Sequence, residues 1–337
     1  MADRVLVTGV SGFLGGHVAL QLLEAGYIVR GSVRSLSKAD KVRETLERAG
    51  GDLSRLEFVA LDLLRDDGWR EAMADIRFLQ HTASPFLLET PENPDDFIRP
   101  AVDGTRRALE AALAEKVERI VLTSSIAAIQ YGHADYSRPL SEADWTNLDS
   151  PKTGAYARSK TMAEQEAWRL VDAAGRHDDL AVINPAGILG PLLDEDPGTS
   201  SMLVRRMLDG KLPALPKLAM SVVDVRDVAA LQVDAMTNPA AGGQRCIASE
   251  GTYWMSEIGR KLQPAFPDRR IPTAELPNWL LRVVSLFDRD VRDNMHEMGA
   301  MKRIDGHRGS ERLGRPLIPA DQAAIATARS LIEHGLV

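Results

Sequence analysis

The chain has 337 residues, of which 44% are hydrophobic and 26% are charged, a balance typical of a globular protein rather than a disordered or fibrous one. Its formal net charge of −7 argues against nucleic acid as the main partner, because phosphate binding normally requires a basic surface. The apolar runs are too short and too often broken by charges to span a bilayer, which argues against a membrane protein.

The first half of the chain alternates short β-rich runs with longer helical patterns. We expect strands at 4–8, 27–33, 56–59, 78–82, 120–123 and 180–184, and helices at 13–24, 39–49, 102–116 and 153–174. Such alternation predicts an α/β fold in which helices cover both faces of a parallel sheet.

The character of the chain changes after Pro185, where prolines divide it into short segments before a final helix at 320–333. We expect residues 1–184 to form a dinucleotide-binding domain. Residues 185–337 should form a smaller substrate-binding lobe that interleaves with it and covers the carboxyl edge of the sheet.

The lone cysteine, Cys246, rules out a disulfide within the chain and lies in a run that reads as a strand. We expect a buried, inert thiol there. The N-terminus enters a strand almost at once and shows no signal-peptide pattern. These features favour a cytoplasmic protein.

A glycine-rich turn lies between the first strand and the first helix. Gly9 permits the tight turn, Gly12 lets the backbone approach a pyrophosphate, and Gly15 lets the helix pack closely on the strand. The helix N-terminus adds free N–H groups and a partial positive charge. The alternative is a merely structural turn, but this position favours dinucleotide binding on a Rossmann-type, doubly wound sheet.

The end of the second expected strand indicates which dinucleotide binds. NAD sites usually carry an acidic residue there, but this chain has Arg34 and no acid before Asp40. A guanidinium suits the 2′-phosphate of NADP(H), and Lys38 or Lys41 would add a second positive charge. Asp62 and Leu63, after the third strand, occupy the position at which such folds contact the adenine.

Tyr156 and Lys160 lie four residues apart on an expected helix and therefore share a face. A nearby ammonium stabilises phenolate and lowers the pKa of a tyrosine toward the working range. Ser125 follows the strand at 120–123, where its hydroxyl can hold a substrate oxygen. The hypothesis is reversible hydride transfer: Tyr156 protonates the alkoxide, Ser125 orients it, and Lys160 binds the nicotinamide ribose and tunes Tyr156.

With these motifs, the sequence resembles the extended short-chain dehydrogenase/reductases, in particular the group of dihydroflavonol 4-reductases, cinnamoyl-CoA reductases and yeast methylglyoxal/aldehyde reductases. The resemblance covers nearly the whole chain. It rests on TGVSGFLG at 8–15, GSVRS at 31–35, HTASPF at 81–86, PAVDGT at 100–105, LTSSIAA at 122–128, YARSK at 156–160 and VDVRDVA at 223–229.

The resemblance implies that Ser125 is the catalytic serine, that Thr82, Ala83 and Ser84 line the cofactor, and that Pro185, Gly187 and Ile188 flank the nicotinamide. Motifs and resemblance together give the full set of expected NADP(H)-binding residues: Thr8, Gly9, Ser11, Gly12, Phe13, Leu14, Gly15, Arg34, Lys38, Asp62, Leu63, Thr82, Ala83, Ser84, Thr123, Tyr156, Lys160, Pro185, Gly187 and Ile188.

Two departures from related patterns narrow the function. Sugar-nucleotide epimerases typically carry an Asn where this chain has Ala101, which favours the reductase branch. The segment before Tyr156 lacks the cysteine-bearing signature of cinnamoyl-CoA reductases, which disfavours a thioester substrate. The alternatives are an epimerase or dehydratase that retains NAD, and a non-catalytic dinucleotide sensor.

Several other features of the sequence are interpreted as structural rather than as functional sites. No histidine pair has metal-ligand spacing, so we expect no metal. The acidic run 194–196 reads as a solvated loop, the segment 223–228 as structural ion pairing, and 279–287 as core, with a partner surface as the alternative. A homodimer is possible. Expected wall residues of a largely apolar pocket for a small carbonyl or alcohol substrate are Phe86, Tyr136, Ile188, Leu192 and Met202.

Overall fold

The computed structural model describes residues 2–84, 93–277, 279 and 297–337. Its main sheet has seven parallel strands in the spatial order β3-β2-β1-β4-β5-β6-β9. The strands are β1 (Arg4–Thr8), β2 (Ile28–Val33), β3 (Leu56–Ala60), β4 (Phe78–His81), β5 (Arg119–Thr123), β6 (Leu180–Pro185) and β9 (Gln244–Ala248). The strand order reverses between β1 and β4, and open α/β sheets bind their ligands at such a switch point.

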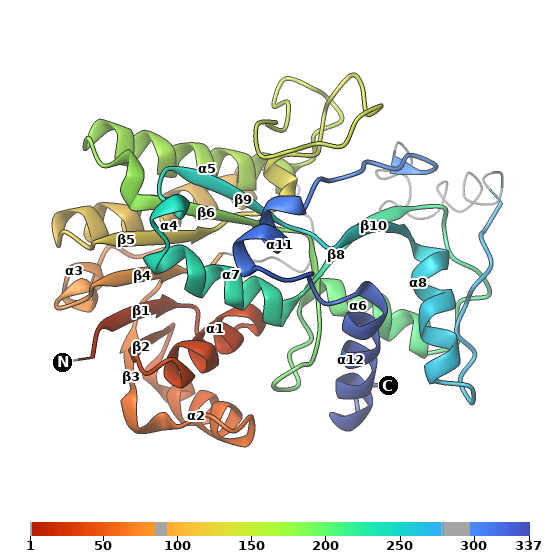
Figure 1. Cartoon of the computed structure of the whole chain (residues 1–337), viewed down its shortest axis with the longest axis horizontal. Coiled ribbons are helices and arrows are strands. Elements are labelled where there is room, and N and C mark those ends of the chain that lie inside the picture. Colours follow the sequence, from red (N-terminus) through yellow and green to blue (C-terminus); the bar gives the residue numbers. More distant parts are fainter. Residues whose placement is uncertain (1, 85–92, 278, 280–296) are drawn as a thin grey trace.

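Helices cover both faces of this sheet (Figure 1). One face carries α3 (Trp69–Met73), α4 (Asp95–Ala114) and α5 (Ala155–Ala173); the other carries α1 (Phe13–Glu24), α2 (Ala39–Arg48) and α7 (Val225–Thr237). Successive strand residues point to opposite faces, so Val5 and Val7 enter one core while Leu6 enters the other. This explains why the strands read as continuous apolar runs.

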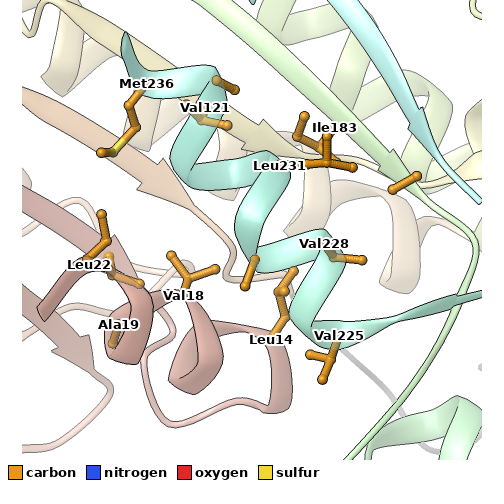
Figure 2. Packing of buried hydrophobic residues seen from close by; sticks show 14 of the residues in the cluster. Leu14, Val18, Ala19, Leu22, Val121, Ile183, Val225, Val228, Leu231 and Met236 are labelled. Atoms are coloured by element: carbon orange, nitrogen blue, oxygen red, sulfur yellow. The ribbon is translucent and has the colours of Figure 1, made fainter. Parts of the chain in front are cut away.

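The packing of α1 against α7 shows how distant parts of the chain are joined (Figure 2). Val18 and Leu22 from α1 and Val228 and Leu231 from α7 are all fully buried, between the two helices and the sheet. Burying each such side chain contributes about 1.5–3 kcal/mol. Helix α7 thereby fastens the second half of the chain to the first strand–helix unit.

A second, three-stranded sheet has the order β10-β8-β7 and belongs to a smaller lobe, on the right in Figure 1. Its strands are β7 (Gly187–Leu189), β8 (Ala219–Asp224) and β10 (Gly251–Trp254). Helices α6 (Gly198–Leu208), α8 (Met255–Leu262) and α12 (Ala320–Glu333) enclose a separate apolar core with it. Helix α11 (His307–Leu313) packs on α7 and β9.

Short 3₁₀ turns complete the described structure: η1 (Leu36–Lys38), η2 (Leu53–Arg55), η3 (Ile126–Ala128), η4 (His177–Asp179), η5 (Pro239–Ala241) and η6 (Gln263–Ala265). Every helix in the described part of the chain is too short or too polar to cross a bilayer. In the same part, no three His, Cys, Asp or Glu side chains gather around a possible metal position.

The predicted fold class, a Rossmann-type parallel sheet with helices on both faces, is confirmed. The predicted start of the fourth helix at Val102 is wrong, because α4 begins at Asp95 and contains Pro100. Pro100 lies in the second turn of α4, where it cannot donate to the carbonyl of Asp96 and its ring crowds that carbonyl, while acidic residues in the first turn favour the helix dipole.

Strand β9 and helix α7 come from the half of the chain assigned to the lobe but pack into the main sheet unit. These two elements are where the two halves of the chain interleave in the structure. The domain boundary at 184/185 stays a prediction. Cys246 lies buried in β9, where burial raises the pKa of its thiol to about 12, as expected of an inert cysteine. Phe86 and most of the predicted stretch 279–287 lie outside the described residues.

Candidate active site

The glycine turn forms the floor of the site. Gly9 has a φ of +69°, a backbone conformation that favours glycine. A Cβ on Gly15 would lie 2.2 Å from the carbonyl oxygen of Gly9, so the close approach of α1 to the turn requires a glycine there. Gly12 is the N-cap of α1 and offers no capping side chain, which leaves the N–H groups of the first turn for an anion.

The loop after β4 forms the adjoining wall. Thr82 donates its hydroxyl to the carbonyl of Thr8 at 2.6 Å, and the N–H of Ala83 donates to the Thr8 hydroxyl at 3.1 Å. The His81 ring contacts the same hydroxyl at 2.9 Å. Burial, reinforced by the charge of Lys160, lowers the pKa of His81 to about 4, so the ring is neutral near pH 7. These bonds join β1 to β4 at the switch point.

Arg34 and Lys38 follow β2 and are exposed. Among the described residues neither side chain has a hydrogen bond or ion pair, which leaves both positive charges available for a ligand. Lys41 instead pairs with Asp194 at 3.9 Å.

Asp194 also lines a pocket beside the glycine turn, together with Ser11, Gly12 and Phe13. The acidic run 194–196 lies in a loop after β7, as expected from the sequence, and its first residue faces this pocket.

A second pocket lies at the carboxyl ends of β4 and β5. Its lining includes several of the predicted residues: Leu63, Ala83, Ser84, Thr123 and Lys160. The Lys160 ammonium donates to the Ser84 hydroxyl at 3.0 Å. The carboxylate of Asp62, whose adenine role stays a prediction, accepts from the N–H of Leu64 at 2.9 Å.

The three predicted catalytic residues come from two elements. Tyr156 and Lys160 lie on α5, and Tyr156 is 43% exposed, with its ring edge-on to Phe97 at 6.0 Å between centroids. Ser125 follows β5 at the start of η3, a turn that packs against α5. The Ser125 oxygen accepts from the N–H of Ala127 at 3.0 Å. Its own O–H has no acceptor among the described residues, which leaves that proton for a substrate.

Ser124, rather than Ser125, lines the cavity with Lys160 and bonds the buried carboxylate of Glu164. Asn184 and Arg245 bond the same carboxylate. The sequence interpretation missed Glu164 and the two other residues that bond its carboxylate. The signal for Glu164 is its spacing, because it continues the four-residue series of Tyr156 and Lys160. No local signal indicated Arg245.

For the remaining expected residues, the structure gives the element on which each lies or a contact within the protein. Pro185 ends β6, and Gly187 and Ile188 open β7, so their place beside the nicotinamide stays a prediction. Thr123 accepts at its hydroxyl from the side-chain amide of Gln232 at 2.6 Å. Of the expected pocket wall, Leu192 is 5% exposed and packs in the core of the lobe.

Tyr136 packs against an apolar core cluster and also contacts a charged side chain. The Lys302 ammonium lies 5.1 Å from the centre of the Tyr136 ring and 4.5 Å from that of Tyr131. Lys302 also pairs with Glu297. Burial, followed by the charge of Glu297, raises the pKa of Tyr131 to about 12. The role of Tyr136 in a largely apolar substrate pocket stays a prediction.

The segment 223–228 carries structural charges, as predicted. Asp224 caps α7 and binds Arg226 at 2.7 Å, while the buried Asp227 binds Arg315 at 2.7 Å.

A Rossmann-type sheet, a glycine turn at its switch point and a Tyr–Lys helix beside the neighbouring cavity together define a dinucleotide-binding enzyme. Comparison with known proteins supports this class. A model of the NAD dependent epimerase/dehydratase family matches residues 5–248. The chain belongs to this family, whose members include the extended short-chain dehydrogenase/reductases that the motifs resemble.

Several of the similar proteins are named as reductases. The chain is 32% identical to tetraketide alpha-pyrone reductase 2 of Arabidopsis thaliana over 79% of this chain and 84% of that protein. It is 31% identical to cinnamoyl-CoA reductase 2 of Medicago truncatula over 99% of this chain and 92% of the relative. The solved structure of yeast methylglyoxal/isovaleraldehyde reductase complexed with NADPH matches with a TM-score of 0.81 at 25% identity, over 99% of this chain and all of that one.

Proposed function

We propose that this protein is an NADPH-dependent reductase that converts an aldehyde or ketone to an alcohol by reversible hydride transfer. The observation that carries the proposal is the cavity at the ends of β4 and β5, which Lys160 enters from the helix that also bears Tyr156. The reductase names of the similar proteins, and the NADPH in the solved yeast structure, support the same reading.

The residues present fit NADP(H). The turn requires glycine at Gly9, whose φ is +69°, and at Gly15, where a Cβ would meet the carbonyl of Gly9, and the uncapped start of α1 offers N–H donors for a pyrophosphate. Arg34 and Lys38 supply exposed positive charge without a competing partner among the described residues. A 2′-phosphate would satisfy both, whereas NAD lacks that group. Because Lys41 already pairs with Asp194, we assign the helper role to Lys38.

NADPH, when bound, supplies the hydride for the carbonyl carbon. The chain's own residues manage the oxygen. Tyr156 donates its hydroxyl proton to that oxygen as negative charge develops, and the ammonium of Lys160 stabilises the resulting phenolate. The free O–H of Ser125 holds the same oxygen in place. In the oxidative direction Tyr156 accepts the proton from the alcohol.

The substrate is a small molecule, and the polar cluster of Tyr131, Tyr136 and Lys302 favours a carbonyl compound with a further polar group. A cytoplasmic location and a homodimer stay predictions. Cell fractionation tests the first, and light scattering on the purified protein tests the second.

Two rival functions remain distinguishable. An epimerase or dehydratase would hold oxidised NAD through the catalytic cycle and show no net redox change. A dinucleotide sensor would bind without turnover. Arg34, Ala101 and the retained Tyr–Lys pair favour the reductase over both.

The experiment measures oxidation of NADPH and of NADH by the purified protein over a panel of aldehydes, ketones and diketones, with Tyr156→Phe as the control. We expect turnover with NADPH and a loss of about 10²–10⁴-fold in the control, because the phenol proton is removed. Undiminished turnover of Tyr156→Phe would refute the scheme. Copurifying NAD without any carbonyl turnover would favour the epimerase or dehydratase.

A further inference from the structure

Helix α5 carries a third ionisable residue, Glu164, on the face that bears Tyr156 and Lys160. These two residues and Glu164 follow one another at intervals of four, so their side chains lie along one stripe of the helix. The stripe runs inward: Tyr156 is 43% exposed, Lys160 is half-buried and Glu164 is fully buried. Lys160 and Glu164 line the same cavity.

The Glu164 carboxylate has a complete set of hydrogen-bond donors. Ser124 donates its hydroxyl to one oxygen at 2.5 Å, and the side-chain amide of Asn184 donates to the same oxygen at 2.8 Å. The guanidinium of Arg245 bonds the other oxygen at 2.6 Å. A carboxylate that is buried without such partners would be strongly destabilising, so this arrangement holds Glu164 in one position.

Arg245 is itself fixed. Its guanidinium donates to the backbone carbonyls of Glu142 and Asp144 at 2.8 and 2.7 Å, and it lies 3.9 Å over the ring of Trp145. The positive charge is therefore anchored to the loop before α5 and to strand β9. The buried carboxylate thus has a rigid counter-ion.

Two of these bonds reach the segment that carries the predicted catalytic serine. Glu164 holds the side chain of Ser124, and the Asn184 amide that binds Glu164 also donates to the carbonyl of Ser125 at 3.2 Å. The segment is therefore held at the side chain of Ser124 and at the carbonyl of Ser125. The O–H of Ser125 has no protein acceptor among the described residues.

We propose that Glu164 is a positioning residue that locks the end of β5, with Ser125, to the helix that carries Tyr156 and Lys160. This inference rests on the proposed function, since it assigns a purpose to the alignment of the three predicted catalytic groups. We propose that the buried carboxylate acts through the hydroxyl of Ser124 and the side-chain amide of Asn184. Misplacement of reacting groups by about 1 Å can lower the rate about 10²-fold, so the loss of this alignment should appear as a measurable fall in kcat.

The first test replaces Ser124, which removes one bond to Glu164 and leaves the buried ion pair intact. We expect Ser124→Ala to lower kcat about 10–100-fold, while KM for NADPH stays within about twofold, because the cofactor-binding turn is untouched. Ser124→Thr keeps the hydroxyl and should restore most of kcat. A purely structural role would lower the melting temperature of Ser124→Ala without changing kcat of the folded enzyme.

The second test removes the charge of Glu164. Glu164→Gln should lower kcat at least as far as Ser124→Ala, and the double variant should be no slower than the slower single one, because the two residues act as a unit. Glu166→Gln is the matched control: it lies on the same helix and loses only the surface pair with Arg169. We expect it to keep wild-type kcat.

The outcomes separate the two proposals. Inactive Tyr156→Phe with wild-type kcat in Ser124→Ala would overturn the role of Glu164 and leave the reductase assignment standing. Active Tyr156→Phe would overturn the proposed function itself. If Glu164→Gln fails to fold because Arg245 loses its partner, Ser124→Ala and its Thr rescue still decide the question.

Discussion

At the scale of single residues, the chemistry depends on groups that stay unsatisfied within the protein. The O–H of Ser125 has no acceptor among the described residues, and Arg34 has no counter-charge there. Polar groups elsewhere in the site are paired, as Lys41 is with Asp194 and Ser124 with Glu164. Groups without a partner in the protein are what a ligand can satisfy, so we expect Ser125 to contact the substrate and Arg34 the cofactor.

Replacing Arg34 tests the cofactor assignment. Arg34→Ala should raise KM for NADPH about 10–100-fold and leave that for NADH nearly unchanged, because a charge-assisted bond to a phosphate contributes about 1.5–3 kcal/mol. Steady-state kinetics with both cofactors measure this change. The matched control is Lys41→Ala, whose charge is already engaged by Asp194 and whose effect should be smaller. An equal rise for both cofactors would contradict a 2′-phosphate contact.

The parts of the site that could be predicted from sequence are those formed by neighbours along the chain. The glycine turn and the pair Tyr156 and Lys160 lie within one turn or one helix, so their spacing determines their geometry. Arg245 lies 81 residues from Glu164, and their contact exists only because β9 joins the sheet beside β6. No periodicity encodes that strand order, so the buried network could not be predicted.

At the scale of elements, the strand–turn–helix unit of β1 and α1 is the most tightly constrained part of the site. Its turn tolerates no side chain at Gly15, and the same close approach places the N–H groups of α1 at the cavity. The strands were predicted well because both of their faces are buried and read as apolar runs. The start of α4 was predicted wrongly because Pro100 resembled a helix boundary.

Gly15→Ala should therefore disrupt both stability and cofactor binding. The added Cβ would lie 2.2 Å from a backbone oxygen that cannot move without opening the turn. We expect a loss of about 1–3 kcal/mol in the free energy of unfolding and a weaker affinity for NADPH, measured by urea denaturation and by fluorescence titration. Gly154→Ala is the control, since a Cβ there meets open space. Wild-type affinity in Gly15→Ala would argue against the turn as the phosphate site.

At the scale of the whole molecule, three apolar cores are joined by elements that cross between the halves of the chain. Helix α7 packs on α1, and strand β9 extends the main sheet, so the lobe and the sheet unit are continuous. Because titratable groups are buried at the junction of β1 and β4, the free energy of unfolding of the whole protein should depend on pH. His81 is the clearest of them, because burial lowers its pKa to about 4.

The free energy of unfolding should fall as the pH is lowered from about 6.5 to 4. Over that range the unfolded chain binds a proton at His81 while the folded protein does not, and the difference amounts to at most about 3 kcal/mol. Burial lowers the pKa of His17 as well, in the same direction. Urea denaturation at a series of pH values measures the slope. His81→Asn should show a shallower slope than wild type, and an identical slope would contradict a neutral, buried His81.

The most direct test of the central claim follows the hydride itself. NADPH carrying deuterium at C4 of the nicotinamide is incubated with the enzyme and a carbonyl substrate identified from the panel, and the alcohol is analysed by mass spectrometry and NMR. With the correct face labelled, the account predicts one deuterium on the carbinol carbon and about 10²–10⁴-fold slower formation of this product by Tyr156→Phe. The contrary result is a product without deuterium whichever of the two C4 hydrogens is labelled, together with a cofactor that stays bound and shows no net oxidation. That result would contradict net hydride transfer and support the epimerase or dehydratase.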